Sequence, residues 1–301
     1  MVQTLVIVQT VYRIIYHPAL NPILLWINRL FSPITKFQLP PSGTIKIKTD
    51  EGAQFKMITN QTSYVTKLLY WNGANSFEYT PVFKKLVTSC NVFIDIGANT
   101  GYYSLVASMI NKEIEVHSFE PAQGPLHYLN KNVMLNNLEK RISVHPIALS
   151  GKSGSLNFYE VRNKKYSYLP HNLGGVGSLV HDESKTAYSV KTETLDSFIN
   201  EKSISTIDLI KIDTEGTENL ILEGAEKIIR KFQPIIICET LFNRIESKLE
   251  AIMKNHGYLF FNYKNRKLEE VSTLFREADN GVRDCFFVPL SKLHLIKEFI
   301  K

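Results

Sequence analysis

The chain has 301 residues, of which 44% are hydrophobic and 21% charged, an ordinary composition for a globular protein. This length suits one large domain with an appendage or two domains, and the formal net charge of +6 is modest. The three cysteines, Cys90, Cys238 and Cys285, lie far apart in the sequence. A disulfide framework or a zinc site would need clustered cysteines, so both are excluded, and a reducing cytoplasm is the expected compartment.

The first 49 residues combine apolar runs with basic side chains and contain no acidic residue. Arg13, Pro18 and Pro22 divide the apolar sequence into pieces shorter than the roughly 20 residues of a membrane-spanning helix. The positive charge follows the first apolar run, whereas in a secretory signal it precedes that run. Two interpretations stay open. The segment forms helices that pack on the protein's own core or on a second subunit, or it makes peripheral contact with an anionic membrane through an in-plane helix.

A loop at Pro40, Pro41 and Gly43 ends this segment, and residues 44–49 alternate apolar and polar side chains as a half-exposed strand does. We therefore divide the chain into an N-terminal appendage, residues 1–60, helical hairpin-like and then extended, and a domain of residues 61–301. Helices are expected at residues 62–70 and 80–88.

From residue 91 onward, short apolar runs alternate with helical patterns. Strands are expected at residues 92–96, 115–119, 142–149, 208–212, 234–238, 258–263 and 285–288. Nearly continuous apolar strands separated by helices indicate a parallel sheet covered on both faces. One helix is expected to carry Ile221, Ala225, Ile228 and Phe232. Residues 154–198 interrupt this alternation of strands and helices. We interpret them as a hairpin with a glycine-bearing loop, inserted at the carboxyl edge of the sheet.

The turn after residues 92–96 is the expected primary site, because ligands of open α/β sheets bind outside the carboxyl ends of the strands. Gly97 and Gly101 let the backbone approach a ligand closely, and the amides of the next helix can receive a carboxylate. Asp95 can accept a hydrogen bond from an ammonium group. Glu120 closes the second strand, where an acid binds ribose hydroxyls. A ligand with an amino-acid end and an adenosine-type ribose is S-adenosylmethionine.

Several motifs follow one another in order over about residues 76–263. They are Val-Phe-Ile-Asp-Ile-Gly-Ala-Asn-Thr-Gly-Tyr-Tyr-Ser (92–104), Phe119-Glu120-Pro121, Thr194-Leu195-Asp196, Asp-Leu-Ile-Lys-Ile-Asp-Thr-Glu-Gly-Thr-Glu (208–218), Leu222-Glu223-Gly224-Ala225 and the run 234–239. Together they resemble the FkbM family of methyltransferases. The resemblance implies a Rossmann-like class I methyltransferase fold with a seven-stranded sheet whose last strand is antiparallel. It also implies O-methylation of a hydroxyl on a sugar, a lipid-linked glycan or a secondary metabolite.

By position, the resemblance implies that Gly97, Asn99 and Gly101 face the methionine part of the cofactor. It likewise implies that Glu120 binds the ribose and that Ala148 lies near the adenine.

A second cluster of charged residues begins with Lys211 inside the strand 208–212 and continues after it with Asp213, Glu215 and Glu218, and Glu239 comes at the end of the next strand. Strand-end carboxylates point into the same crevice as the cofactor, so Asp213, Glu215 and Glu239 are the candidate catalytic residues. They act as a general base on the acceptor hydroxyl, or they bind a divalent metal ion that lowers the pKa of that hydroxyl. In a third interpretation Asp213 and Glu215 are structural, capping the following helix and pairing with Lys211.

Two histidines, His171 and His181, flank the glycine-bearing loop and are alternative bases or acceptor contacts. A nucleic-acid substrate is not expected, because the turn 213–216 has no aromatic residue to stack a base and no basic stripe lies beside the site. The main alternative function is that of a nicotinamide-dependent oxidoreductase, since Glu120 also suits an NAD ribose. That class predicts Gly-x-Gly-x-x-Gly, whereas this turn reads Gly-x-x-x-Gly. A non-catalytic binding module of the same fold is the other alternative.

Overall fold

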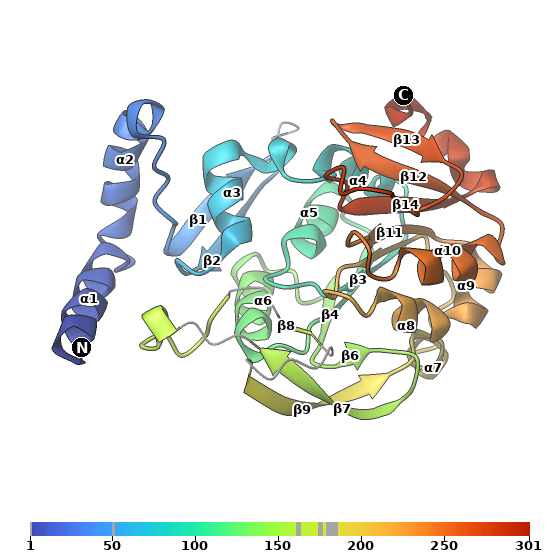
Figure 1. Ribbon diagram of the computed structural model, residues 1–301, viewed down its shortest axis with the longest axis horizontal. Coiled ribbons are helices and arrows are strands. Elements are labelled where there is room, and N and C mark those ends of the chain that lie inside the picture. The colour runs from blue at the N-terminus through green and yellow to red at the C-terminus, as the bar shows by residue number, and fades with distance from the viewer. Residues whose placement is uncertain (1, 50–51, 161–163, 174–176, 179–185) are drawn as a thin grey trace.

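The computed structural model describes residues 2–49, 52–160, 164–173, 177–178 and 186–301 (Figure 1). A large sheet forms its centre, with spatial strand order β13-β12-β14-β11-β10-β3-β4-β5. The strands are β3 (Val92–Ile96), β4 (Glu115–Phe119), β5 (Ile142–His145), β10 (Leu209–Ile212), β11 (Ile235–Glu239), β12 (Tyr258–Lys264), β13 (Lys267–Val271) and β14 (Asp284–Pro289). Strands β5, β4, β3, β10 and β11 are parallel, and β14 lies antiparallel between β11 and β12. The expected antiparallel last strand is therefore confirmed.

The sheet has one strand more than the seven expected. The chain turns back after β12 through Asn265 and Arg266, both with positive φ (51° and 61°), and β13 pairs antiparallel with β12 at the sheet edge. Two successive residues with positive φ form the tight turn that joins antiparallel strands. β13 is largely charged, so its sequence has no apolar run from which a strand could be predicted.

Helices cover both faces of this sheet because neighbouring strand residues point to opposite sides. Phe93 belongs to the core on one face, with α4 (Thr80–Val87), α5 (Tyr102–Ile110) and α6 (Gln123–Leu135). Ile94 belongs to the core on the other face, with α7 (Leu195–Glu201), α8 (Glu218–Glu223), α9 (Glu226–Phe232) and α10 (Glu246–Lys254). The predicted parallel sheet covered on both faces is confirmed, and the three free cysteines are buried in these cores.

The helix expected to carry residues 221–232 is instead two helices, α8 and α9, and that prediction was wrong. The Gly224 carbonyl accepts a hydrogen bond from the Asp196 amide (2.9 Å) and not from an amide of the same helix, and a Cβ on Gly224 would lie 2.4 Å from the carbonyl oxygen of Ser150. The carboxylate of Asp196 accepts hydrogen bonds from the amides of Lys227 and Ile228 (3.0 Å each), which gives α9 its own start.

The third expected strand, residues 142–149, is also divided. β5 ends at His145, and β6 (Ala148–Leu149) joins a second sheet of order β6-β9-β7-β8. In it, β7 (Gly154–Glu160) pairs antiparallel with β9 (Thr186–Glu193), and β8 (Gly177–Ser178) pairs with β7. The segment expected as an inserted hairpin thus contains this antiparallel pair, but from Leu195 onward it forms α7. The glycines of the intervening loop at 174–175 and His181 lie outside the described residues.

The N-terminal part begins with α1 (Val2–Ile15) and α2 (Asn21–Thr35). Figure 1 shows α2 extending onward from α1, so the two helices do not fold back on each other as the expected hairpin would. After α2 the chain returns along it, with the Asn28 side chain bonded to the Phe37 carbonyl (3.1 Å) and the Leu39 amide (2.7 Å). Among the described residues, no helix combines the length and apolar character needed to cross a bilayer.

A small antiparallel sheet, β1 (Gly43–Lys48) and β2 (Gln54–Thr59), links these helices to the rest. Its apolar side chains, such as Ile45 and Met57, lie in the same core as α4, α5 and α6. The Asn132 side chain of α6 accepts a hydrogen bond from the Ile58 amide (2.6 Å). The remaining helical elements are α3 (Tyr64–Asn72) and the 3-10 turns Ala74–Ser76, Lys164–Tyr166, Leu290–Leu295 and Lys297–Phe299.

Candidate active site

A cavity of about 280 Å³ opens at the carboxyl ends of β3, β4, β10 and β11. The strand order reverses here, because β4 lies on one side of β3 and β10 on the other, and this is where open α/β sheets bind ligands. Most of the predicted site residues line the cavity: Gly97, Asn99, Glu120, Ala148, Asp213, Glu215 and Glu239. Asp95 and Gly101 do not line it.

The turn after β3 is held by close backbone packing. Gly97 has φ +70°, and a Cβ there would lie 1.9 Å from the carbonyl oxygen of Asp213. Gly101 has φ +87°, and its Cβ would lie 2.5 Å from a methyl carbon of Leu129 in α6. Each glycine therefore lets a neighbouring element approach at a backbone angle that other residues rarely adopt.

Glu120 is buried, and its carboxylate is oriented by two backbone amides. Oε2 accepts a hydrogen bond from the Asn99 amide and Oε1 from the Ala122 amide, both at 2.8 Å. Burial raises the pKa of Glu120 to about 7, although these two hydrogen bonds oppose the shift. Each oxygen keeps further acceptor capacity on the cavity side. The arrangement suits two adjacent hydroxyl donors.

Asp95 lies behind the cavity wall rather than on it. Its Oδ2 accepts a hydrogen bond from Ser104, and its Oδ1 lies 3.6 Å from Nζ of Lys211, the residue opposite it on β10. Nζ also donates to the Gly97 carbonyl (2.8 Å) and lies 3.4 Å from Oδ2 of Asp213. Burial alone would lower the pKa of Lys211, but Asp213 and Asp95 outweigh it and the pKa is raised. The ammonium group facing Asp95 in the structure is thus that of Lys211.

An apolar wall forms the far side of the cavity. Ala148 lies in this wall at the start of β6, and Phe119 and Pro121 come from the end of β4. Phe158 of β7 adds an aromatic ring from the second sheet. Apolar surface in the same cavity as the amide-oriented Glu120 suits a purine joined to a ribose.

The three candidate catalytic acids come together at one end of the cavity. Asp213, Glu215 and Glu239 each place a carboxylate oxygen within 4.8 Å of the others. Burial, followed by the negative charges of Asp213 and Glu215, raises the pKa of Glu239 to about 10. Oε2 of Glu239 is buried without a hydrogen-bond partner. At neutral pH Glu239 therefore holds a proton until a positive charge enters the cluster.

Glu218 has a different role from its neighbours in the sequence. It is buried, and its carboxylate accepts hydrogen bonds from the Thr214 amide and hydroxyl (2.9 Å each) and from the Gly216 amide (3.1 Å). These bonds hold the loop that presents Asp213 and Glu215. Glu218 thus has a structural role that was not predicted for it from the sequence. Of the ion pairs with Lys211 expected for Asp213 and Glu215, the one with Asp213 is seen at 3.4 Å.

Two further acids, neither of which was predicted from the sequence, border this cluster. Glu78, just before α4, lines the cavity and accepts a hydrogen bond from the Tyr103 hydroxyl (3.0 Å). Burial and the nearby Asp213 raise the pKa of Glu78 to about 7. Asp284 begins β14 directly opposite Glu239, and burial together with Glu78 raises its pKa well above the usual range. Asp284 could have been found from the sequence. An antiparallel strand begins at the edge of the sheet where its parallel neighbours end, so the first residue of the last strand lies at the cavity.

His171, proposed as an alternative base, does not line the cavity. Its ring stacks on that of His127, with centroids 3.8 Å apart, and its carbonyl accepts a hydrogen bond from Asn60 (2.9 Å).

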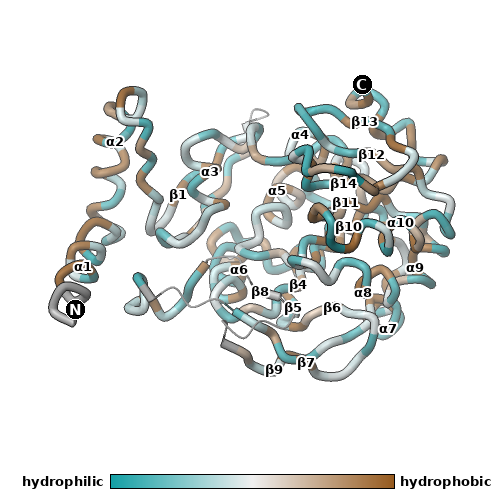
Figure 2. Tube along the Cα trace, viewed as in Figure 1, coloured by the Kyte–Doolittle hydropathy of each residue, from teal (hydrophilic) through white to brown (hydrophobic). Residues whose placement is uncertain are grey.

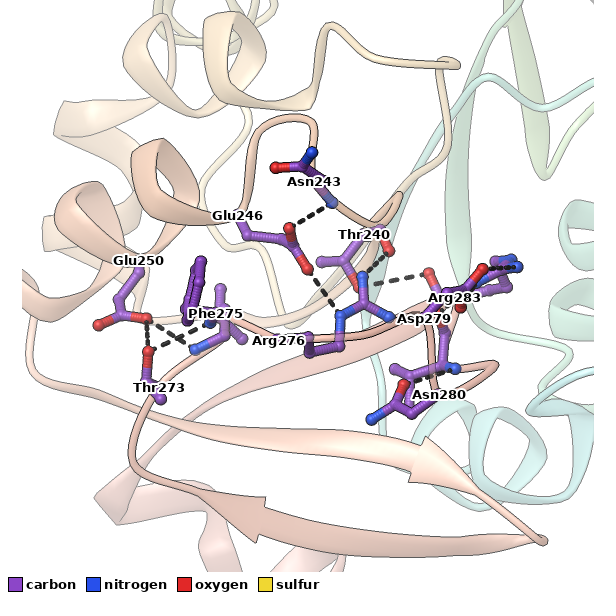
Figure 3. Close-up of polar contacts among 12 residues, drawn as sticks. Thr240, Asn243, Glu246, Glu250, Thr273, Phe275, Arg276, Asp279, Asn280 and Arg283 are labelled. Carbon is purple, nitrogen blue, oxygen red and sulfur yellow. Dashed lines mark hydrogen bonds and ion pairs between the residues drawn. The ribbon is translucent and has the colours of Figure 1, made fainter.

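Beyond the end of β11, a buried ion pair fixes the chain that follows Glu239 (Figure 3). Arg276 donates to the carboxylate of Glu246 (2.6 Å) and to the carbonyls of Val282 (2.6 Å) and Thr240 (2.8 Å). Thr240 is the residue after Glu239. The guanidinium thus ties the loop before β14 to α10 and to the end of β11, and so positions Glu239.

Seven strands of the sheet follow the order β5-β4-β3-β10-β11-β14-β12, and β14 is the one antiparallel strand among them. The cavity at the strand ends contains an acid, Glu120, placed to bind a ribose. These features define a class I methyltransferase fold. The model for the methyltransferase FkbM domain matches residues 95–260. The chain belongs to this family of methyltransferases.

Two relatives carry methyltransferase names. Methyltransferase sdnD from Sordaria araneosa is 24% identical over 196 residues, which cover 55% of this chain and 72% of that protein. The 31-O-demethyl-FK506 methyltransferase FkbM from Streptomyces tacrolimicus is 27% identical over 157 residues, which cover 45% of this chain and 60% of that protein. A crystal structure of methyltransferase FkbM from Methylobacillus flagellatus KT aligns with a TM-score of 0.41 at 16% identity, over 66% of this chain and 44% of that one. The match thus spans less than two thirds of the last two proteins.

Proposed function

We propose that this chain transfers a methyl group from S-adenosylmethionine to a hydroxyl of a sugar, a lipid-linked glycan or a secondary metabolite. One observation carries the proposal. A single cavity joins an amide-oriented acid, Glu120, to a cluster of three carboxylates, Asp213, Glu215 and Glu239. The first suits the ribose of an adenosine-type cofactor, and the second suits a positive sulfonium and an acceptor that must lose a proton.

The residues of the cavity fit this cofactor from end to end. Glu120 offers its oxygens to the ribose, the wall at Ala148 and Phe119 receives the adenine, and the turn from Gly97 to Asn99 is left for the methionine part. When bound, the cofactor supplies an electrophilic methyl group. The protein's task is then to hold an acceptor oxygen in line with that methyl at near-attack distance, which accounts for much of the rate in such a transfer.

Asp213 and Glu215 are the groups we assign to the acceptor proton. Asp213 is half-exposed to the cavity and held by Lys211, so it can receive a proton without moving far. The same three carboxylates also match the oxygen ligands of a divalent cation, which would instead lower the pKa of the hydroxyl. The two versions predict different variant behaviour, which is developed in the Discussion.

We expect micromolar binding of S-adenosylmethionine and of its demethylated product, weakened at least about tenfold by Glu120→Ala. The substitution removes a carboxylate that the backbone has already oriented toward the ribose. Isothermal titration calorimetry measures both affinities. Glu115→Gln, an exposed acid at the opposite end of the same strand, serves as the matched control and leaves the affinity unchanged. No heat with either ligand, together with tight binding of NAD, contradicts the proposal in favour of the oxidoreductase.

The affinity for S-adenosylmethionine is also expected to fall by about tenfold between pH 8 and pH 6. The pKa of Glu120 is raised to about 7, so its carboxylate takes up a proton as the pH falls through that value and loses acceptor capacity for the ribose hydroxyls. Glu120→Gln, which cannot titrate, binds more weakly and with a flat profile. Calorimetry at several pH values tests this. If the affinity of Glu120→Gln falls with pH as steeply as that of the wild type, the titrating group is Glu78, whose pKa is raised to a similar value.

A further inference from the structure

The outer surfaces of α1 and α2 expose more large apolar side chains than any other helices in the described part of the chain. On α1, Ile7, Val11 and Ile14 are exposed at intervals of three and four residues. On α2, Ile23, Trp26, Leu30 and Ile34 follow the same spacing, with Trp26 63% and Ile34 83% exposed. This spacing places each set on one side of its helix. We call these seven residues the apolar stripe; Figure 2 shows both helices as largely hydrophobic and set apart from the central sheet.

The opposite side of the same helices packs against the protein. Tyr12 contacts the ring of Tyr166 at a centroid distance of 5.6 Å, and the Arg13 guanidinium lies 5.2 Å from the ring of Tyr168. In α2, Leu25 is buried. The helices are thus held in place by one side, and the apolar stripe is left to a partner outside the chain.

The charge of the N-terminal segment that carries the apolar stripe indicates what that partner is. Residues 1–49 contain five basic residues and no acidic one, and all five are exposed. They are Arg13, Arg29, Lys36, Lys46 and Lys48. A second copy of this chain would bring two such basic segments together, which like charges oppose. An anionic lipid surface complements both the charge and the apolar stripe.

We propose that α1 and α2 lie in the plane of an anionic membrane surface, with the apolar stripe among the acyl chains and Lys36, at the end of α2, at the headgroups. Arg13, which packs on Tyr168, stays on the protein side and adds to the positive field of the segment. The helices are too short to span the bilayer, so the contact is peripheral. Apolar burial and charge attraction act together, and salt screens only the second. This inference does not depend on the cofactor or the acceptor.

The full-length chain is expected to co-sediment with vesicles of phosphatidylcholine and phosphatidylglycerol, and much less with phosphatidylcholine alone. The triple substitution Ile23→Ser, Trp26→Ser and Leu30→Ser lowers the partition coefficient at least about tenfold, since it removes apolar burial. The matched control replaces Phe275 and Leu290, which are 59% and 71% exposed elsewhere on the surface, by serine and changes nothing. Lys36→Gln weakens binding to the anionic vesicles about fivefold.

Tryptophan fluorescence reports on the same contact from within the chain. Of the two tryptophans, Trp26 belongs to the apolar stripe, whereas Trp71 is half-buried and donates to the Leu39 carbonyl (2.9 Å). Anionic vesicles are expected to shift the emission to shorter wavelength, and Trp26→Phe abolishes the shift while retaining sedimentation.

Failure of the wild-type chain to bind anionic vesicles overturns the proposal, as does undiminished binding of a triple variant with wild-type thermal stability. If the wild-type chain does not bind vesicles but forms a dimer in the analytical ultracentrifuge, and the triple variant stays monomeric, a second copy of the chain covers the apolar stripe instead.

Discussion

Asp213→Asn is expected to lower kcat by roughly 10²–10⁴ while the affinity for S-adenosylmethionine stays nearly unchanged. Asparagine keeps the shape of the side chain but cannot accept the acceptor's proton or bind a cation as a carboxylate does. Glu120 and the apolar wall, which hold the cofactor in our proposal, are untouched. The comparison requires methyl-labelled S-adenosylmethionine and an acceptor identified from fractionated glycan, glycolipid and small-molecule extracts. Glu226→Gln, which removes an exposed acid on α9, is the control for a change of net charge.

Glu239→Gln separates the base from the metal. Because the pKa of Glu239 is raised to about 10, this residue already carries a proton at neutral pH, and glutamine resembles that neutral form. If Asp213 and Glu215 act as the base, Glu239→Gln keeps most of the activity and a chelator has no effect. If the cluster holds a metal, the variant loses a ligand, EDTA abolishes wild-type activity, and magnesium or manganese restores it. Full activity of Asp213→Asn in the presence of EDTA would leave these acids with a structural role only.

The cofactor side of the cavity could be predicted because its residues follow one another closely in the sequence. Gly97 and Asn99 directly follow the strand that aims them, and Glu120 ends the next strand in the chain. Parallel strands end at one edge of the sheet, so strand prediction alone brings these residues together. The same reasoning brought Asp213 and Glu239 to the cavity, since each comes at or directly after the end of a strand.

The remaining acids depend on distances that a single sequence does not contain. Glu78 reaches the cavity from the segment before α4, which precedes the first strand of the central sheet. The partner of Asp95 is set by strand register, which places Lys211 directly across from it on β10. Register depends on how whole strands pair, and periodicity within one strand carries no information about it.

Local sequence also failed where tertiary contact overrides a regular pattern. The apolar spacing from Ile221 to Phe232 is that of one continuous helix, yet hydrogen bonds to the backbone and side chain of Asp196 replace helical bonds and divide it in two. β13 was missed because its sequence shows no regular apolar pattern at all: Leu268 is its only fully buried side chain. An edge strand whose two apolar residues, Leu268 and Val271, are three positions apart gives no alternating pattern to detect.

Arg276→Met is expected to lower the free energy of unfolding by about 3–5 kcal/mol, the usual cost of removing one partner from a buried ion pair. Arg276 and Glu246 are both almost fully buried, and loss of the guanidinium leaves the Glu246 carboxylate without its cation. The carbonyls of Thr240 and Val282 lose a donor at the same time. Methionine fills much of the same volume, so the change reflects charge and hydrogen bonding rather than a cavity.

Urea unfolding followed by circular dichroism measures this loss, and two further variants locate its origin. Adding Glu246→Leu to Arg276→Met removes the unpaired charge and is expected to recover part of the stability, because an apolar pair of similar volume tolerates burial better than a lone carboxylate. Arg283→Met breaks the exposed pair with Asp279 and removes the hydrogen bond from Nη1 to the Val282 carbonyl (2.9 Å), which keeps its bond from Arg276. The expected cost is less than about 1 kcal/mol. Equal losses for Arg276→Met and Arg283→Met would show that solvent already screens the interior pair. In that event the end of β11, and with it Glu239, is held by the strand hydrogen bonds to β14 and not by the guanidinium.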